Sequence, residues 1–568
     1  MIRLRKVSKK YSKREIYPDE IFLDSSNLPS FNVQQFEGTI EKPISKTTVR
    51  VFSFIIFFVF VGITARLASL QIFAGAKYYD QSVRNSLDKE ILFSERGVIY
   101  DRNGVELAWN EKKEEGEIVP KRSYIDGGGF SHILGYVSYP KLDSSGNYWQ
   151  EDFIGKSGVE AEYNDLLSGE NGERLIERDV FGNIYSENSI KSSIAGENLY
   201  LTIDSVLQSA FYDSIKNHSE EYGYVGGAGV IMSIKSGGVL AMTSYPEFDS
   251  EIMSLGEDKE TINSYQNDKS KPFLLRSLSG LYTPGSIVKP FVAIGALEEG
   301  VIDEEKQIYS SGSISLVSPY DPDVVYTYKD NKAHGWVDMR RALTVSSNVY
   351  FYEISGGFEN QKGLGISGIE KYTRMFGIGE KTGIDLSGEK DGIIPNPDWK
   401  KKVFNGDIWR VGDTYNTAIG QYGFQVTPIQ MVRAIAAIAN GGTLVTPHVT
   451  ITSDEELVSK EPLPIDPEHF DVVREGIRGV VLEGTGIALS YLPIDIAAKT
   501  GTAQVGLAKQ RVNSWVVGFF PYQDPQYAFV VIMENGPLDQ PGATWVMQKT
   551  LSKVDTFDFL LEKEVKED

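Results

Sequence analysis

One uncharged stretch near the start of the chain sets the strongest limit on how the chain can fold. Residues 51–65 contain no charged side chain and only Ser53, Gly62 and Thr64 among apolar residues. A helix of that length reaches about 22 Å, whereas the hydrocarbon core of a bilayer is about 30 Å thick. Extension to residue 73 closes the gap if the Arg66 side chain reaches toward the lipid headgroups. The pattern predicts a transmembrane helix over residues 51–73.

Two features decide whether this segment is cleaved and how it is oriented. Ala74-Gly75-Ala76 imitates a signal-peptidase site, but the apolar run is long and the fifty residues before it exceed the basic start of a signal peptide. An uncleaved signal anchor is the better interpretation. The nearest flanks carry equal numbers of basic residues, but residues 1–50 carry ten in all, which favours a cytoplasmic N-terminus under the positive-inside rule. We expect a single-pass protein of the cytoplasmic (inner) membrane with its main part outside the cytoplasm.

Composition excludes several classes of function. The chain has 568 residues, too many for one ordinary core, and its net charge of −21 argues against nucleic acid as a partner. Without cysteine it can form neither a disulfide nor a thiolate nucleophile. Its five histidines have no metal-ligand spacing, so we expect no metal and no cofactor. Residues 18–43 lack periodicity and are predicted to be mostly disordered.

Three short motifs point to a serine enzyme whose base is a lysine: Ser286-Ile287-Val288-Lys289, Ser346-Ser347-Asn348 and Lys499-Thr500-Gly501-Thr502. A serine hydroxyl needs a neighbouring base before it can attack a carbonyl carbon. At a spacing of three residues on a helix, serine and lysine share one face, about 5 to 6 Å apart at Cβ. A turn at residues 283–285 precedes the apolar run 291–297, which places Ser286 in the first turn of a helix.

Two of these motifs also occur elsewhere in the chain, and their surroundings show which copies are functional. Three other SxxK copies start at Ser86, Ser138 and Ser387. The copy at Ser86 lies in a charged stretch, a Tyr-Pro pair follows Ser138, and Ser387 lies in a loop-like segment. A second KTG begins at Lys381 between turn residues, whereas Lys499 follows the apolar run 494–498, which we predict to be a strand. Context therefore favours Ser286 and Lys499.

Further motifs carry a family resemblance that spans about residues 50–550. The chain resembles the class B penicillin-binding proteins, which are monofunctional peptidoglycan D,D-transpeptidases. The landmarks are Arg96-Gly97-Val98-Ile99-Tyr100-Asp101-Arg102-Asn103-Gly104, His132-Ile133-Leu134-Gly135-Tyr136, Gly155-Lys156-Ser157-Gly158, Leu201-Thr202-Ile203-Asp204, Asp413-Thr414, Thr427-Pro428 and Ala439-Asn440-Gly441-Gly442. Gly155–Gly158 followed by Tyr163 favours the elongation-type subgroup. Departures from the family pattern occur at Leu275-Arg276, at Ile287-Val288 and in Gly420-Gln421-Tyr422-Gly423, and none removes a chemical group that the reaction needs.

The resemblance implies an α+β architecture in five parts. These are a cytoplasmic tail (1–50), a transmembrane anchor (51–73), an extended β-rich pedestal of the class B dimerisation type (74–200), a transpeptidase domain with a central antiparallel sheet flanked by helices (201–557), and a charged tail (558–568). The residues themselves predict a hairpin over 226–240 with its turn at 236–238, a helix over 427–439, and strands over 515–519 and 528–533.

The resemblance also implies a role for each motif residue. Ser286 would attack the penultimate D-Ala carbonyl of a stem peptide, with Lys289 as its base. Ser346 would relay the proton to the leaving amine and Asn348 would hold the substrate amide. The backbone N–H groups of Ser286 and Thr502 would form the oxyanion hole. Lys499, Thr500 and Thr502 would bind the substrate carboxylate, with Gly501 part of the same substrate-binding motif.

The motifs leave two alternatives open. The first is a β-lactamase or D,D-carboxypeptidase of the same superfamily, in which water completes the reaction. The second is a protein that acts mainly as an activating scaffold for a SEDS-family glycan polymerase. The partners implied are D-Ala-D-Ala stem peptides, β-lactams, the polymerase and other cell-wall assembly proteins. We expect His334 to be structural, and Trp336 and Tyr422 to lie in the core.

Overall fold

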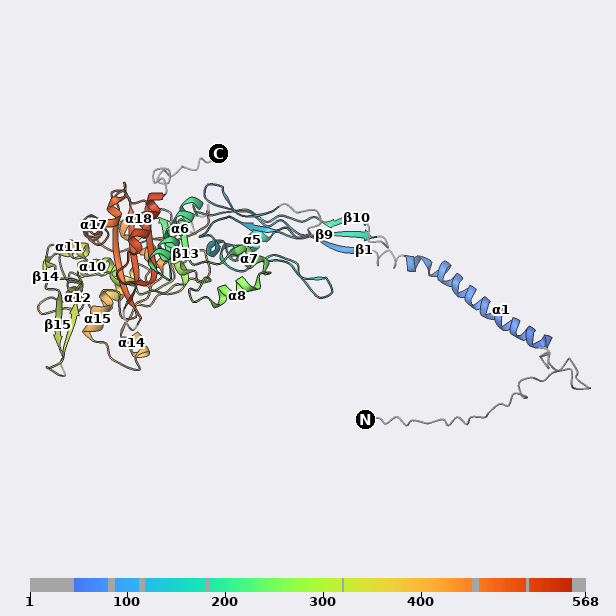
Figure 1. Ribbon diagram of the computed structural model, residues 1–568, viewed down its shortest axis with the longest axis horizontal. Coiled ribbons are helices and arrows are strands. Elements are labelled where there is room, and N and C mark those ends of the chain that lie inside the picture. Colours follow the sequence, from blue (N-terminus) through green and yellow to red (C-terminus); the bar gives the residue numbers. More distant parts are fainter. Residues whose placement is uncertain are drawn as a thin grey trace, which may run out of the picture. The chain divides into compact units, whose positions relative to one another are not determined.

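The computed structural model describes residues 45–79, 87–111, 118–178, 184–318, 321–451, 459–506 and 510–553 (Figure 1). The predicted disorder at 18–43, the charged tail from 558 and the SxxK copy at Ser86 lie outside these residues. By its internal contacts the chain divides into two units, residues 1–88 with 177–185, and residues 89–176 with 186–568.

The first unit contains the helix expected to cross the membrane. Helix α1 (Lys46–Ala68) starts at the N-cap Ser45, whose hydroxyl accepts the Thr48 N–H at 3.0 Å, and continues into the π-helical turn η4 (Ser69–Phe73). Among the described residues this is the one helix long and apolar enough to span a bilayer, and none of its side chains is buried against protein. The helix begins at residue 46 rather than 51, because the polar residues before the apolar run continue the same helical turns.

The first part of the second unit consists of short strands and helices. A four-stranded sheet has the order β11-β2-β3-β4, and β1, β9 and β10, most of whose residues belong to this unit, form a three-stranded one. Two more pairs are β5 with β8 and β6 with β7. The elements are β1 (Leu87–Leu92), β2 (Ile99–Tyr100), β3 (Glu106–Asn110), β4 (Arg122–Tyr124), α3 (Ser131–Leu134), β5 (Val137–Ser138), β6 (Lys141–Leu142), β7 (Tyr148–Gln150), β8 (Ile154–Gly155), α4 (Gly158–Glu162), α5 (Asn164–Ser168), β9 (Gly172–Arg178), β10 (Ile184–Lys191) and β11 (Leu199–Tyr200).

A buried ionic triad holds this part together. The Glu160 carboxylate accepts from the Arg96 Nε at 2.5 Å and from the Arg122 Nε at 2.8 Å, and all three side chains are almost fully buried. A second Arg96 nitrogen donates to the Glu160 carbonyl oxygen and to Asn164. Because an unpaired charge in such a place is costly, the triad ties the residue 96 segment and β4 firmly to α4.

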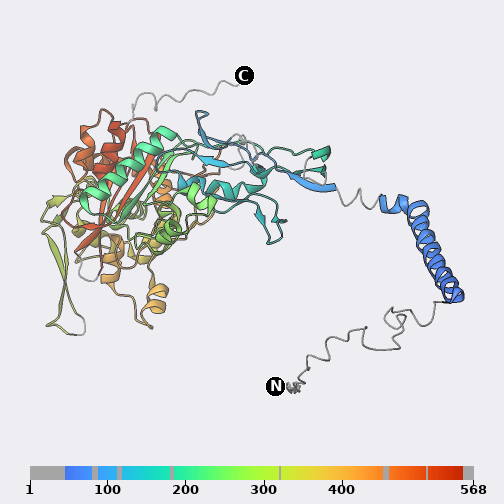
Figure 2. The ribbon, with the colours of Figure 1, turned by 45° about the vertical axis from the view of Figure 1, so that its right-hand side comes forward.

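The larger part of the second unit is built on a five-stranded antiparallel sheet with the order β13-β12-β22-β21-β20. Its strands are β12 (Gly226–Ser233), β13 (Val239–Tyr245), β20 (Ala497–Val505), β21 (Arg511–Phe520) and β22 (Tyr527–Pro537). The predicted hairpin and both predicted C-terminal strands are confirmed. Helices α6 (Ser205–Tyr222) and α18 (Ala543–Lys553) pack on one face, which Figure 2 shows for α6.

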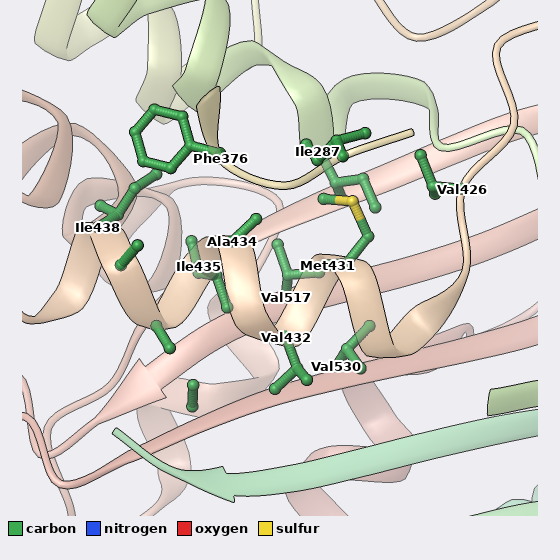
Figure 3. Close-up of a cluster of buried hydrophobic side chains, with 14 of the residues drawn as sticks. Ile287, Phe376, Val426, Met431, Val432, Ala434, Ile435, Ile438, Val517 and Val530 are labelled. Carbon is green, nitrogen blue, oxygen red and sulfur yellow. The ribbon is translucent and has the colours of Figure 1, made fainter. Parts of the chain in front are cut away.

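The opposite face of the sheet is covered by α16 (Pro428–Ala439). Thr427 caps it in a capping box with Gln430, so the helix starts where the sequence predicts. Figure 3 shows its apolar side chains between Val517 and Val530 of the sheet on one side and Ile287 and Phe376 on the other. The core between sheet and α16 therefore also supports the segment that carries Ser286.

The remaining elements surround this core. The helices are α7 (Ser250–Leu255), α8 (Lys259–Asn267), α9 (Arg276–Ser279), η5 (Gly285–Val288), α10 (Lys289–Glu298), α11 (Met339–Val345), α12 (Asn348–Gly356), α13 (Gly365–Met375), α14 (Pro397–Val403), α15 (Val411–Ala418), α17 (Pro467–Glu483) and η7 (Ile487–Tyr491). The strand pairs are β14 (Ile308–Ser310) with β17 (Gly335–Val337), β15 (Ser313–Val317) with β16 (Val325–Lys329), and β18 (Thr443–Val445) with β19 (Lys460–Pro462).

Two sequence expectations are wrong in detail. The strand predicted over residues 494–498 begins only at Ala497, because the carbonyl of Asp495 accepts the Tyr522 N–H and that of Ile496 accepts from Arg478. Trp336 is not a core residue: it is 64% exposed on β17, beside the Tyr309 ring. A two-stranded sheet leaves one of its faces to solvent, and Trp336 lies there.

Candidate active site

Ser286 lies on the 3-10 turn η5, and Lys289 is the first residue of α10. The predicted helix start is confirmed, although its first turn is 3-10 rather than α-helical. Pro290 occupies the first turn of α10, where a missing N–H costs little. Ser286 is partly exposed, whereas Lys289 is completely buried. The nucleophile candidate therefore faces solvent while its base candidate is shielded from it.

Glycines allow three segments to meet at this turn. A Cβ on Gly285 would lie 3.1 Å from the Thr502 carbonyl oxygen, and one on Gly501 would lie 2.7 Å from the Pro284 carbonyl oxygen. A Cβ on Gly420, whose φ is +72°, would lie 2.1 Å from the Gly285 carbonyl oxygen. The edge strand β20 and the Gly420 loop thus approach η5 at backbone distance, which only glycine permits.

The Lys289 nitrogen is held by the second motif. It donates to the Ser346 carbonyl oxygen and to the Asn348 side-chain oxygen, both at 2.8 Å, and lies 3.3 Å from the Ser346 hydroxyl. Burial lowers the pKa of Lys289 from 10.5 to about 7, although the Asp330 carboxylate opposes the change. A substantial fraction of this lysine is therefore neutral near pH 7.

The Ser346 hydroxyl lies between two lysines. The Lys499 nitrogen donates to it at 2.9 Å and to the Thr500 carbonyl oxygen at 3.0 Å. Lys499 is also completely buried, and burial together with repulsion from Lys289 lowers its pKa well below 10.5. Ser346 itself has a left-handed backbone with φ +56° at the end of α11, which turns its carbonyl and hydroxyl toward the lysines.

Hydrogen-bond geometry shows what a neutral Lys289 can do. A neutral amine has two hydrogens and one lone pair. Its two short contacts, to the Ser346 carbonyl and the Asn348 amide oxygen, use both hydrogens. The lone pair is left for a hydroxyl proton, and the Ser346 hydroxyl lies 3.3 Å away. The amine can therefore exchange a proton with the hydroxyl of the second motif.

Two polar residues near the motifs were not anticipated from the sequence. The Asp330 carboxylate accepts the N–H groups of Asn348 and Val349 at the start of α12. The Thr485 hydroxyl is hydrogen-bonded to the Thr500 hydroxyl. Asp330 follows a strand and Thr485 lies between two glycines, so both show only the signal of a turn residue. His334 has a nearly buried side chain 3.8 Å from Asp330, which fits the structural role expected for it.

The competing motif copies lie in other surroundings. Ser138 is buried in β5, and Ser387 is exposed in a turn. Lys381 is exposed and belongs to no strand, while the Thr382 and Gly383 that follow it donate their N–H groups to Glu389. Lys499, Thr500, Gly501 and Thr502 lie together on β20. The structure brings the predicted set of three motifs together and leaves the copies apart.

Comparison with known proteins fits this geometry. The sequence profile of the penicillin binding protein transpeptidase domain matches residues 227–551, more than half of the chain, and that of the penicillin-binding protein dimerisation domain matches residues 114–201. The chain belongs to the penicillin-binding protein transpeptidase family. The resemblance noted in the sequence is thereby confirmed, as is an α+β fold with both of these domains.

Individual relatives point to one branch of this family. The peptidoglycan D,D-transpeptidase MrdA of Acinetobacter baumannii is 33% identical over 443 residues, which is 73% of this chain and 63% of that protein. MrdA of Escherichia coli K12 is 28% identical over 83% of this chain and 88% of its own length. The penicillin-binding protein PBP2 of Helicobacter pylori, solved in complex with MreC, superimposes with a TM-score of 0.69 at 28% identity, covering 84% of this chain and all of that one. The elongation-type branch is the one that the sequence favours.

Proposed function

We propose that this chain is a membrane-anchored peptidoglycan D,D-transpeptidase that cross-links stem peptides through an acyl-enzyme on Ser286. The observation that carries the proposal is the Lys289 amine, which is buried, has a pKa near 7 and has both hydrogens committed to Ser346 and Asn348. A base with that pKa is close to the optimum for proton transfer at neutral pH. Family membership and the names of the relatives support the same activity.

In the acylation step the Ser286 oxygen attacks the penultimate D-Ala carbonyl carbon, and Lys289 takes the serine proton. Ser346, in contact with both lysines, relays this proton to the nitrogen of the terminal D-Ala as the peptide bond breaks. An ester remains on Ser286. The backbone N–H groups of Ser286 and Thr502 serve as oxyanion donors, each worth about 3 to 4 kcal/mol.

Substrate binding falls to the edge strand and the second motif. Lys499, Thr500 and Thr502 hold the terminal carboxylate along β20, with Gly501 allowing the strand to approach the Ser286 turn. When Lys289 no longer donates to the Asn348 side-chain oxygen, Asn348 holds the amide of the substrate. An amine of a second stem peptide then attacks the ester, so that a new amide forms and Ser286 regains its proton. β-Lactams react at the same serine through their ring amide, and their acyl-enzyme persists.

The division of the chain follows from the same proposal. Residues 51–73 anchor it, residues 74–200 form the pedestal, residues 201–557 form the transpeptidase domain, and 1–50 and 558–568 are tails. The profile matches at 114–201 and 227–551 support these limits. The N-terminus lies in the cytoplasm and the catalytic domain outside it, beside a SEDS-family glycan polymerase and other cell-wall proteins. The MreC complex of the H. pylori relative supports an assembly of this kind.

Labelling with a fluorescent penicillin tests the proposal. The full chain in detergent should form a stable covalent adduct, and Ser286→Ala should form none while keeping its thermal unfolding midpoint. Ser387→Ala, which changes an exposed serine of another SxxK copy, is the matched control and should label like wild type. Rapid turnover of a chromogenic cephalosporin in place of stable labelling would favour a β-lactamase.

Protease protection tests the orientation. In cells with a permeabilised outer layer, an epitope tag before Met1 should resist added protease and a tag after Asp568 should be cut. Basic residues on the short tail are the reason for this expectation. Cleavage of the first tag with protection of the second would reverse the topology.

A further inference from the structure

A buried carboxylate lies directly behind the second motif and takes no part in the steps above. Asp330 follows β16, and its side chain is fully buried. One of its oxygens accepts the Asn348 N–H at 2.8 Å, and the other accepts the Val349 N–H at 3.0 Å. These are the first two residues of α12, whose N–H groups have no partner within the helix.

Hydroxyl groups complete the surroundings of this carboxylate. Ser347 donates to Asp330 at 2.7 Å while its oxygen accepts the Tyr350 N–H as the N-cap of α12. Ser310 on β14 donates at 3.1 Å, and the Asn331 N–H donates at 2.9 Å. Five donors from three segments of chain therefore converge on one carboxylate. Two of them come from consecutive residues of the Ser346-Ser347-Asn348 motif.

We infer that Asp330 is the positioning residue of the second motif: its carboxylate fixes the Ser346–Asn348 turn so that the Ser346 carbonyl and the Asn348 amide oxygen meet the Lys289 amine. Ser347 and Asn348 are bonded to Asp330 directly, and Ser346 is joined to them through a left-handed backbone that needs an external hold. The inference rests on the proposed function, because it assigns Asp330 a part in the same proton transfer.

Electrostatics give this role a signature that a merely structural carboxylate lacks. Hydrogen bonds from Asn348, Ser347 and Val349 outweigh the effect of burial and lower the pKa of Asp330, so it is negative at working pH. This charge raises the pKa of Lys289 against the larger effect of burial. Lys499 on β20 also lies near Lys289, and the pKa of His334, beside Asp330, is lowered by burial. Loss of the Asp330 charge should therefore favour neutral Lys289.

The test is the substitution Asp330→Asn in the full chain in detergent, measured as the second-order rate of acylation by a fluorescent penicillin between pH 5 and pH 9. An asparagine cannot accept from the N–H groups of both Asn348 and Val349, so the turn loosens and the rate should fall at least tenfold at pH 8. The acidic limb of the profile should also move to lower pH, by about one pH unit for the loss of one nearby charge.

Glu389→Gln is the matched control. Glu389 is a buried carboxylate of the same domain that accepts the N–H groups of Thr382 and Gly383, but it holds the KTG copy outside the site. This variant should lose thermal stability, keep its acylation rate within threefold and show an unchanged pH profile. If Asp330→Asn behaves in the same way as this control, the inference is wrong.

A second pair of variants covers the case in which Asp330→Asn does not fold. Ser310→Ala and Ser347→Ala each remove one donor to Asp330 and leave its charge in place. Each should lower the acylation rate severalfold with an unmoved acidic limb, and rates within twofold of wild type for both would overturn the inference. Failure of wild type itself to label would instead refute the proposed function, so the two failures are distinguishable.

Discussion

Replacement of Lys289 by arginine separates a general base from a fixed cation at one position. At pH 7 about half of the Lys289 side chains are neutral, since burial lowers the pKa from 10.5 to about 7. The ordinary pKa of arginine lies at least about two units above that of lysine, so an equal lowering by burial would leave at most about 1% of it neutral at pH 7. That fraction predicts a loss of at least about 50-fold.

The variant should also show a distinctive pH dependence. Wild-type acylation should fall about tenfold per pH unit well below pH 7, because Lys289 becomes protonated there, and should level off above pH 8. The arginine variant should still be rising between pH 7 and pH 9. Steric crowding adds to the loss, because the site is completely buried and arginine is larger.

The assay is the second-order rate of acylation by a fluorescent penicillin, measured for the full chain in detergent. Lys381→Arg serves as the control, because Lys381 is exposed in the other KTG copy and the change should leave the rate within about twofold. Acylation by Lys289→Arg within about tenfold of wild type, a loss of less than about 1.4 kcal/mol, would remove Lys289 from the role of base.

Two further substitutions test other parts of the structure. Lys499→Ala should lower the acylation rate at least about 100-fold by removing a buried hydrogen-bond donor to Ser346, whereas Lys381→Ala should stay within a few-fold. The opposite order would show that the KTG copy at Lys381 is the functional one. Glu160→Gln should destabilise the protein by about 3 to 5 kcal/mol, because two buried arginines lose their partner. Glu170→Gln, which breaks an exposed pair, should leave stability almost unchanged in the same denaturation experiment, and equal losses for the two variants would contradict the reasoning.

Local spacing explains why the reacting groups could be predicted from the sequence. Ser286 and Lys289 are three residues apart at a helix start. The two signals for that start, a Pro-Gly turn and an apolar run, lie within a few residues of them in the sequence. The same holds for α16, whose cap and first turn are contiguous. The transmembrane helix is set by composition alone, apart from its first turns.

Residues that contact the motifs from distant parts of the sequence could not be predicted from local spacing. Asp330 reaches the start of α12 from a loop 18 residues earlier, and Thr485 reaches Thr500 from a different element. Neither has a spacing that any helix or strand period would select. The error at residues 494–498 has a related cause, because an apolar run is compatible with a packed loop as well as with a strand, and only the carbonyl partners of Asp495 and Ile496 distinguish them.

The pKa values of Lys289 and Lys499 are the property of the site that the sequence predicts least. On a surface both would be protonated up to about pH 10. Here α10 and the edge strand β20 bury both nitrogens against the single hydroxyl of Ser346, where two full charges would repel each other with little water between them. Burial therefore lowers the pKa of both lysines, to about 7 for Lys289, and repulsion from Lys289 adds to the lowering at Lys499. Lys289 can then act as a base near neutral pH, so the catalytic competence of the motif set depends on burial that neither motif encodes alone.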